Sequence, residues 1–179
     1  MGRRPAFNPD HVLERARDAF WTNGYEATSL EDLLAATGLS KSSLYASFGD
    51  KQQVFLASFD RYRDDRAAEM RALLAAKPGL PGVRAFFESI IDGDPATSLG
   101  NGCLSMNQGF EQAHREPAIR ARVASDLEMI RQALLDALAE GRRLGQVRPD
   151  AELDGAASAL AIAFVGFQFR QAVPEGAQP

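Results

Sequence analysis

A lysine and several hydroxyl side chains lie close together in residues 41–48. The cluster consists of Lys41, Ser42, Ser43, Tyr45 and Ser47. Ammonium and hydroxyl groups can hydrogen-bond both phosphates and base edges. A helix that carries such groups on its outer face is narrow enough to enter a DNA major groove, so DNA binding is the leading hypothesis.

Two short helices joined by a glycine turn are expected to position this cluster. Thr28 is predicted to cap the first helix, with Glu31 three residues later completing a capping box. Gly38 can adopt the left-handed conformation that ends a helix, and Ser40 is predicted to cap the second helix. The apolar residues predicted to face inward are Leu30, Leu33, Leu34, Leu39, Leu44 and Phe48.

The flanking segments complete a small helical domain. Asn8-Pro9-Asp10 is a strong helix start, and Tyr25, after the end of that helix, is expected to pack beneath the domain. The apolar residues of this helix at three- and four-residue steps are Val12, Ala16, Ala19 and Phe20. Asp50 is predicted to cap a following helix with Lys51 in its first turn. Because a lysine is disfavoured at a helix N-terminus, this position favours a nearby phosphate.

Over about residues 10–56 the chain resembles the tetracycline-repressor (TetR/AcrR-type) family of bacterial transcription regulators. The matching residues are Phe20, Gly24-Tyr25, Thr28-Ser29-Leu30, Ala36, Gly38, Leu39-Ser40, Leu44-Tyr45, Phe48 and Asp50-Lys51-Gln52. Together with the helical pattern, the resemblance implies an all-α fold. Residues 1–51 would form a three-helix helix-turn-helix DNA-binding headpiece, and residues 52–179 a helical-bundle effector and dimerisation domain.

The resemblance also implies which side chains meet DNA. Those expected at base edges or the nearby backbone are Lys41, Ser42 and Ser43. Those expected to hold phosphates are Tyr45, Ser47, Lys51 and either Thr28 or Ser29. Arg3 and Arg4 are similar to a basic arm that some relatives lay along DNA, although two arginines at a terminus are more often a disordered tail.

The overall charge is acidic, with 24 Asp and Glu against 20 Lys and Arg and a formal net charge of −4. Domains that bind nucleic acid are often basic, so the distribution of charge matters more here than the total. Arg3, Arg4, Lys41 and Lys51 fall on the proposed DNA side. We therefore expect moderate non-specific affinity and a steep loss of binding with salt.

The rest of the composition favours a cytoplasmic protein of one or two domains without a membrane partner. No charged and then apolar leader opens the 179 residues, so export is not expected. The apolar run Ala156–Phe169 is too short to span a bilayer. The single cysteine excludes a disulfide within one chain, which is consistent with a reducing compartment.

The second half is predicted to consist of further helices, with breaks at Lys77–Gly82 and Gly93–Gly100. The expected helices cover about residues 50–76, 83–91, 102–114, 117–141 and 150–172, the last capped by Asp150. That last helix is apolar on nearly every side, so more than one of its faces must be covered. It is either a core helix in a monomer or, as we favour, part of a homodimer interface.

A homodimer also suits the headpiece, because two recognition helices one DNA turn apart read a near-palindromic operator. Relatives commonly pair through their last two helices, and another helix would be expected where this chain ends, at Pro179. The interface is therefore expected to combine the helix Pro117–Gly141 with the last helix.

The resemblance implies an effector-binding body in the second half, for a small apolar or aromatic molecule and with no cofactor. The candidate lining residues are Phe59, Tyr62, Phe86, Phe87, Met106, Phe110, Met129 and Phe164. Aromatic residues and methionines at helical spacing are more often core than pocket, so the core alternative stays open. A ligand that wedges these helices could swing the fourth helix and change the separation of the headpieces.

Cys103 is a further candidate, because Asn101–Asn107 resembles a Gly-Cys-Leu segment in a subgroup of the family. Some members of that subgroup sense oxidants or electrophiles through a cysteine. A helix N-terminus would favour the reactive thiolate, which makes an oxidant-sensing repressor an alternative function. The competing interpretation is a small buried apolar residue, and no second cysteine is available within the chain to form a disulfide.

No enzyme is expected. His11 and His114 stand apart without a pattern of metal ligands, and Glu31-Asp32 point in different directions on one helix. We expect a ligand-responsive transcription regulator, and its action as a repressor rests on the resemblance alone. The alternatives from other classes are a helical protein that binds or sequesters small molecules and a protein-interaction domain.

Overall fold

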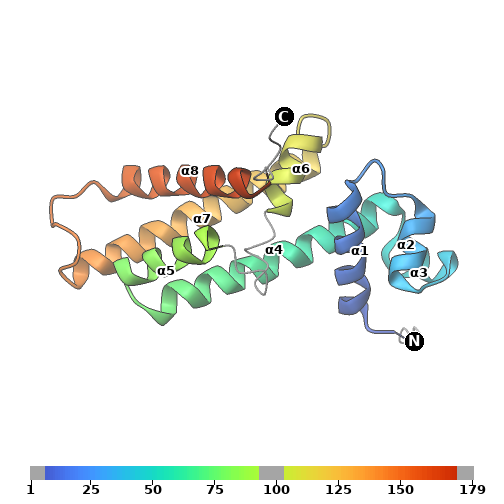
Figure 1. Ribbon diagram of the computed structural model, residues 1–179, viewed down its shortest axis with the longest axis horizontal. Helices are drawn as coiled ribbons and strands as arrows, with labels where there is room; N and C mark the ends of the chain where they lie inside the picture. Colours follow the sequence, from blue (N-terminus) through green and yellow to red (C-terminus); the bar gives the residue numbers. More distant parts are fainter. Residues whose placement is uncertain (1–6, 93–102, 173–179) are drawn as a thin grey trace, which may run out of the picture. The chain divides into compact units, whose positions relative to one another are not determined.

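The computed structural model describes residues 7–92 and 103–172, and every regular element in these two ranges is an α-helix (Figure 1). The helices are α1 (Pro9–Asn23), α2 (Leu30–Thr37), α3 (Lys41–Phe48), α4 (Lys51–Ala76), α5 (Leu80–Ile91), α6 (Leu104–Gln112), α7 (Pro117–Arg143) and α8 (Leu153–Ala172). The predicted all-α fold class is confirmed. The predicted break at Gly93–Gly100 lies outside the described residues.

The chain forms two compact units, Met1–Asp65 and Arg66–Pro179. The division falls inside α4, whereas the sequence predicted a boundary between Lys51 and Gln52. The reason is aromatic packing within the first unit. The ring of Phe55 meets Phe20 edge-on at 5.1 Å between centroids, and Tyr62 meets Trp21 in the same way at 5.3 Å. The first turns of α4 therefore belong to the headpiece.

Helix α1 begins and packs as the sequence predicts. The Asn8 side chain accepts a hydrogen bond from the backbone N–H of Asp10 at 2.9 Å, and Pro9 occupies the first helical position. The residues of α1 that are buried are Val12, Ala16 and Phe20. Tyr25 lies against both Phe20 and Phe55, with ring centroids 5.9 and 5.0 Å away, so it packs into the headpiece as expected.

The cap of α2 lies one residue later than predicted. Ser29 is the N-cap, and it exchanges hydrogen bonds with Asp32, so the capping box predicted for Thr28 and Glu31 is wrong. Thr28 is fully buried, and its hydroxyl donates to the carbonyl of Gly24 at 2.6 Å. Its side chain therefore has a local backbone partner that competes with capping.

The joints on either side of α3 match the prediction. Gly38 ends α2 with φ of 70°, in the left-handed region that favours glycine, and Ser40 caps α3 by accepting from the backbone N–H of Ser43. At the start of α4, Asp50 accepts from the N–H of Gln53 at 2.9 Å, and Gln53 in turn accepts from the N–H of Asp50. This reciprocal pair is a second capping box, and it holds the entry to α4.

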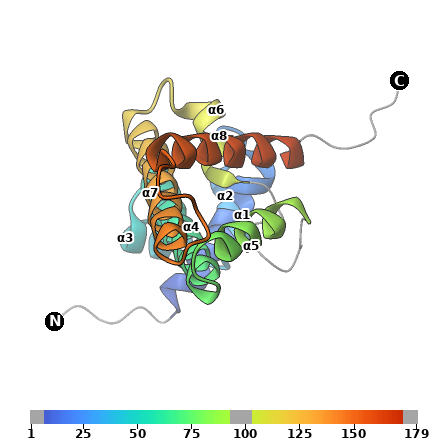
Figure 2. The same cartoon turned by 90° about the vertical axis from the view of Figure 1, so that its left-hand side faces the viewer.

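The second unit packs α7 against α8, α5 and α6 (Figures 1 and 2). Its buried apolar core consists of Met70, Val83, Phe86, Ile90, Ile130, Leu134, Ala137, Leu138, Leu153, Ala157, Ala161 and Phe164. The core draws residues from α4, α5, α7 and α8, so none of these helices buries its apolar face alone.

The connection from α7 to α8 faces the viewer in Figure 2 and ends later than predicted. Helix α8 begins at Leu153, and the Glu152 carboxylate accepts from the backbone N–H groups of Asp154 and Gly155. The predicted cap Asp150 is therefore wrong, because Glu152 is the acid next to the free N–H groups. Among the described helices, none is long and apolar enough to cross a membrane.

Candidate functional site

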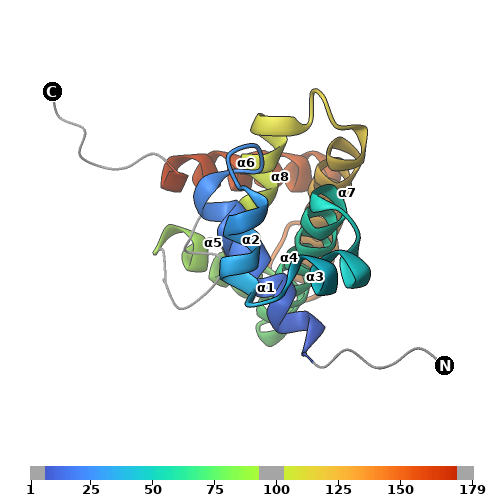
Figure 3. The same ribbon diagram turned by 90° about the vertical axis from the view of Figure 1, so that its right-hand side faces the viewer.

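Helix α3 separates its apolar and polar side chains, and Figure 3 looks onto the helices α1, α2 and α3. Leu44 is fully buried, and the ring of Phe48 lies 6.3 Å from that of Phe7. Lys41, Ser42 and Ser47 are exposed. Because the inward positions anchor α3 to the unit, its polar residues are held on a fixed surface.

Three hydroxyl groups meet at the N-terminus of α3. The Oγ atom of Ser40 lies 3.1 Å from that of Ser42 and donates to that of Ser43 at 3.0 Å. Hydroxyl hydrogens rotate to suit their surroundings, so the exposed Ser42 can turn from this cluster to a phosphate or a base edge. The positive end of the helix dipole favours an anion at the same place.

The charge on α3 is entirely positive. Lys41 is its only charged residue, and the Lys41 ammonium lies 5.9 Å from the centre of the half-buried Tyr45 ring. A cation above an aromatic ring is stabilised modestly at an exposed site. The contact orients Lys41 along the helix and leaves an electropositive surface with no carboxylate on the same element.

Lys51 and Ser29 have internal partners in addition to their predicted DNA role. The Lys51 ammonium donates to the carbonyl of Glu26 at 3.3 Å and lies 4.6 Å from the centre of the Tyr25 ring. The exposed Ser29 donates through its Oγ to Asp32 at 2.7 Å. The hydrogen bond from the Ser29 side chain, and after it the one from the Ser29 backbone N–H, lower the pKa of the Asp32 carboxyl below its ordinary value.

Thr28, Arg3 and Arg4 are the remaining side chains predicted to contact DNA. The Thr28 hydroxyl is buried and donates to the carbonyl of Gly24, so of the pair Thr28 and Ser29 only Ser29 is exposed, and the phosphate contact of this pair stays a prediction. Arg3 and Arg4 lie outside the described residues.

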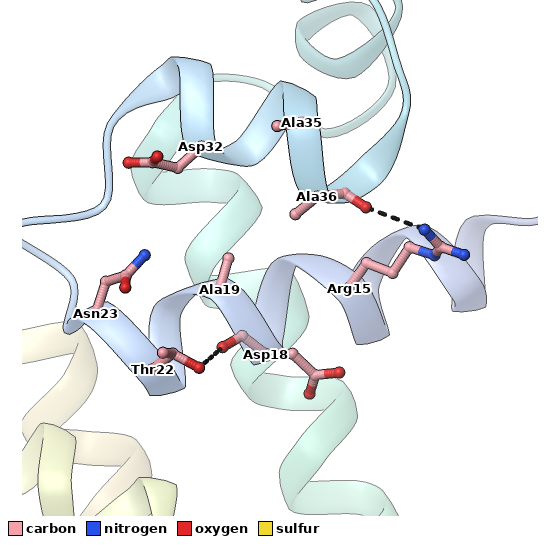
Figure 4. A pocket seen from close by; sticks show the side chains of 8 residues that line it. All are labelled: Arg15, Asp18, Ala19, Thr22, Asn23, Asp32, Ala35 and Ala36. Carbon is pink, nitrogen blue, oxygen red and sulfur yellow. Dashed lines mark hydrogen bonds between the residues drawn. The ribbon is translucent and has the colours of Figure 1, made fainter.

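A surface hollow of about 440 Å³ opens between α1 and α2 (Figure 4). It is lined by Arg15, Asp18, Ala19, Thr22, Asn23, Asp32, Ala35 and Ala36. The guanidinium of Arg15 spans the two helices and donates to the carbonyl of Ala36 at 3.4 Å (Figure 4). With two carboxylates against one arginine, the hollow disfavours a phosphate, and we assign it no role in DNA binding.

Among the predicted effector residues, three aromatic ones come together in the second unit. Phe86 and Phe164 are buried and stack at 5.8 Å between ring centroids. Phe87 meets Phe86 edge-on at 5.3 Å, and it also meets Phe167, a ring that was not predicted, at 6.1 Å. The half-buried Met129 packs against the same core. This aromatic cluster can serve either as core or as one wall of an effector site.

Phe59 and Tyr62 belong to the first unit, whereas that cluster belongs to the second. Both are buried in the first unit, where Phe59 stacks on Phe55 at 5.6 Å and Tyr62 meets Trp21. Both side chains therefore contribute to the core of the headpiece, and their place in an effector site stays a prediction. The side chain of Phe110 lies outside the described residues.

Cys103 is the N-cap residue of α6, and it is buried, as is Met106 on the same helix. A hollow of about 540 Å³ in the second unit lies away from both. Its lining consists of Arg71, Leu74, Ala75, Pro78, Gly79, Ala133, Asp136, Ala137 and Glu140, none of them a predicted effector residue. In the part of the chain that the structure describes, no group of three or more His, Cys, Asp or Glu could hold a metal ion.

Several buried polar residues of the second unit were missed in the sequence. Ser105 of α6 donates to Asp126 of α7 at 2.7 Å, Gln112 donates to Gln108, and Gln168 of α8 is buried as well. The sequence signal for these five residues is weak, because a polar residue at a core-facing helical position cannot be told from a solvent-facing one before the packing is known. Polar residues inside an apolar face are informative when they are buried.

Comparison with known proteins decides the family. Residues 12–58 match the family model described as bacterial regulatory proteins of the tetR family, and residues 79–177 match the model of the tetracyclin repressor-like C-terminal domain. The chain belongs to the TetR family. The resemblance identified in the sequence is therefore confirmed, and the helix-turn-helix lies within the first matching segment.

The curated relatives and solved structures agree with this assignment. The HTH-type transcriptional repressor ComR of Escherichia coli (strain K12) is 31% identical over 154 residues, which cover 85% of this chain and 73% of ComR. The HTH-type transcriptional regulator YezE of Bacillus subtilis (strain 168) is 29% identical over 148 residues, covering 82% of this chain and 76% of YezE. A cysteine mutant of the TetR family regulator CifR, complexed with 26-bp double-strand operator DNA, has a TM-score of 0.82 at 25% identity, covering 96% of this chain and 92% of that chain.

Proposed function

We propose that this TetR-family chain is a transcriptional repressor that binds a near-palindromic operator as a homodimer and is released by a small apolar or aromatic effector. The observation that carries the proposal is the surface of α3, where Lys41, Ser42 and Ser47 are exposed around a buried Leu44. A helix of this kind reads base edges while neighbouring groups hold phosphates. Such a protein acts where the chromosome lies, in the cytoplasm.

The exposed face of α8 supports self-association. Ile162 is 73% exposed and Phe169 is 56% exposed, although both are large and apolar. Small residues occupy exposed positions along the same face, namely Gly155, Ala159 and Gly166. Small side chains allow a second helix to approach closely, and a second copy that covers this face would remove apolar surface from water. We infer that α8, together with α7, forms an isologous dimer interface.

The effector part of the proposal is supported by the aromatic cluster of the second unit. Phe86 and Phe164 stack on each other, and stacked rings can accept another planar molecule by offset or edge contacts. An effector releases DNA only as far as it binds the released conformation more tightly than the bound one. The same cluster also fits the rival class, a protein that only binds small molecules, so DNA binding is the property to measure.

Fluorescence anisotropy tests the proposal directly. Labelled duplexes tiled across the DNA that flanks the gene of this protein are titrated with the full chain in the presence of non-specific competitor. We expect tight, saturable binding to one near-palindromic duplex, weakened steeply by added salt. Weak binding to every duplex, equally abolished by salt, would favour the small-molecule-binding alternative, once operators elsewhere in the genome have been searched by selection from random duplexes.

A further inference from the structure

Gln168 of α8 is buried without any hydrogen-bond partner. The residue is 1% exposed, and neither its Oε1 nor its Nε2 atom forms a hydrogen bond. Among the residues that the structure describes, these are the only buried side-chain nitrogen and oxygen atoms in that state. An unpaired buried amide destabilises the native state, so this position requires an explanation.

The other buried polar side chains show that the fold normally satisfies such groups. Thr37 donates to the carbonyl of Leu33 at 2.6 Å, and Ser105 donates to the Asp126 carboxylate at 2.7 Å. Even Gln112, a residue of the same type as Gln168, is bonded to a second glutamine. Gln168 is therefore an exception within this protein and not an example of loose packing.

Gln168 lies on the same face of α8 as Phe164, a member of the aromatic cluster. The buried face of this helix contains Leu153, Ala157, Ala161, Phe164 and Gln168. Because these residues recur every three or four positions, Gln168 takes the next core-facing place after Phe164, one turn further along. Phe164 is the residue that stacks on Phe86. The unpaired amide thus lies one turn of α8 beyond Phe164, which is one of the two stacked rings.

We propose that Gln168 is the polar recognition residue of the effector site and that it selects an uncharged molecule combining an apolar ring with a carboxamide-type edge. This inference rests on the proposed function, because it names the chemistry of the effector. A glutamine amide offers an acceptor and a donor side by side, and a carboxamide or lactam offers the complementary pair. The ring of the ligand packs on Phe164 and Phe86, as aromatic rings do with one another.

The same observations argue against a charged effector. A neutral amide cannot compensate a full charge that is taken out of water, and the rings of Phe86 and Phe164 supply no counter-charge. A purely apolar effector is also disfavoured, because it would leave the amide as unpaired as it is in the free protein. The chemistry of Gln168 therefore narrows the proposed apolar or aromatic class to molecules with one hydrogen-bonding edge.

Two probes of the same shape test this specificity. Benzamide and acetophenone differ in that the amide –NH2 of the first is a methyl group in the second, so only benzamide offers both a donor and an acceptor. Isothermal titration calorimetry of each probe with the full chain, without DNA, should show that benzamide binds about tenfold more tightly. Competition between the two probes, followed by NMR, provides the same ratio when each binds weakly.

Gln168→Met tests the residue, because methionine has a similar length and no group that needs a partner. We expect the variant to bind both probes equally and, without ligand, to melt at a higher temperature than the wild-type protein. Gln108→Met is the matched control. It removes the hydrogen bonds that Gln108 makes with Gln112 and Glu111, so it should lower the melting temperature and leave the preference for benzamide intact.

Three results would each overturn the proposal: no binding of benzamide to the wild-type protein, equal affinities for the two probes, or a preference for benzamide that survives Gln168→Met. A lower melting temperature for Gln168→Met would do so too, since it would mean that the amide is paired in the free protein. These titrations contain no DNA, so their failure leaves operator binding untouched. Conversely, a protein that bound no operator could still show the benzamide preference.

Discussion

Lys41 carries the only charge on α3, and it stands at the first position of that helix. We expect Lys41→Ala to weaken operator binding and also to relax the preference for particular bases, because a lysine in the major groove can contact guanine directly. Loss of one such contact reduces discrimination at one base pair by about 1–3 kcal/mol. Anisotropy titrations on the operator and on single-base variants of it measure both effects.

The other two lysines of the chain serve as comparisons. Lys77 lies in the second unit and is exposed, so Lys77→Ala should leave operator affinity unchanged. Lys51→Ala should weaken binding to every duplex by a similar factor, as the loss of a phosphate contact does. Equal losses on operator and random DNA for Lys41→Ala would contradict its role in reading bases.

The hydrogen bonds between Ser29 and Asp32 predict a dependence of stability on pH. They lower the pKa of Asp32 in the folded state, and Arg131 and Arg143 lower the pKa values of Glu128 and Glu140 in the same way. A carboxyl with a lowered folded-state pKa stabilises the protein above its unfolded pKa, and that contribution disappears as the pH falls through the folded pKa. The free energy of unfolding should therefore decrease as the pH drops from about 6 to about 3.

Ser29→Ala isolates the share of Asp32 in this behaviour. The variant should be less stable at neutral pH, since it loses the N-cap of α2, and its stability should fall less steeply in acid. Urea titrations at a series of pH values measure both. Glu31→Gln removes the neighbouring carboxylate outside the capping box and should keep the steeper acid dependence of the wild-type protein.

At the scale of the element, α3 depends on Leu44 for its attachment. Leu44 is fully buried, so Leu44→Ala should reduce the free energy of unfolding by about 2–5 kcal/mol. Operator binding should fall with it, because the recognition surface is held in place by this side chain. Ser47→Ala changes an exposed residue of the same helix and should alter stability by no more than about 0.5 kcal/mol.

Urea unfolding followed by tryptophan fluorescence measures this difference. The single tryptophan, Trp21, packs edge-on against Tyr62 in the first unit, so its emission reports on the unit that contains α3. A Leu44→Ala protein as stable as Ser47→Ala would contradict the view that Leu44 anchors the helix.

Local signals in the sequence were sufficient for most helix ends. The caps at Asn8, Ser40 and Asp50 depend on side chains next to the free N–H groups, and the glycine turn at Gly38 depends on its own backbone conformation. Such features need no knowledge of distant packing. The choice between Thr28 and Ser29 did need it, because the two neighbours have similar capping ability and burial decides between them.

Long-range packing was beyond the sequence pattern. Phe59 and Tyr62 show the same helical spacing whether they face an effector site or the core of the headpiece, and only the fold assigns them to the first unit. The same limit applies to Gln168, whose neighbours in the sequence are apolar and whose burial depends on helices far away in the chain. The pattern was therefore more informative for DNA binding, which uses one local motif, than for the effector site.

At the scale of the whole molecule, the exposed face of α8 predicts the oligomeric state. Ile162→Glu places a charge in the middle of the inferred interface, where it would be buried without a partner. We expect the wild-type protein to sediment as a dimer and the variant as a monomer. The monomeric variant should also bind the operator more weakly, because each separate headpiece would bind only its own half-site.

Ile91→Glu provides the comparison for this experiment. Ile91 is a 45% exposed isoleucine on α5, so the same substitution there should leave the dimer intact. Analytical ultracentrifugation of both variants over a range of concentrations separates the two outcomes. A dimeric Ile162→Glu protein would show that copies of this chain associate through another surface.

Helix α4 continues without a break through the division between the two units, and its 26 residues contain neither glycine nor proline. A chimera that joins this headpiece to the effector unit of another family member must therefore keep the helical phase as well as the length. One inserted residue turns all later residues about 100° around the helix axis, whereas seven inserted residues restore the phase to within about 20°. Insertions of seven residues should thus be tolerated better than insertions of one or two. A flexible linker would instead tolerate one or two inserted residues at least as well as seven.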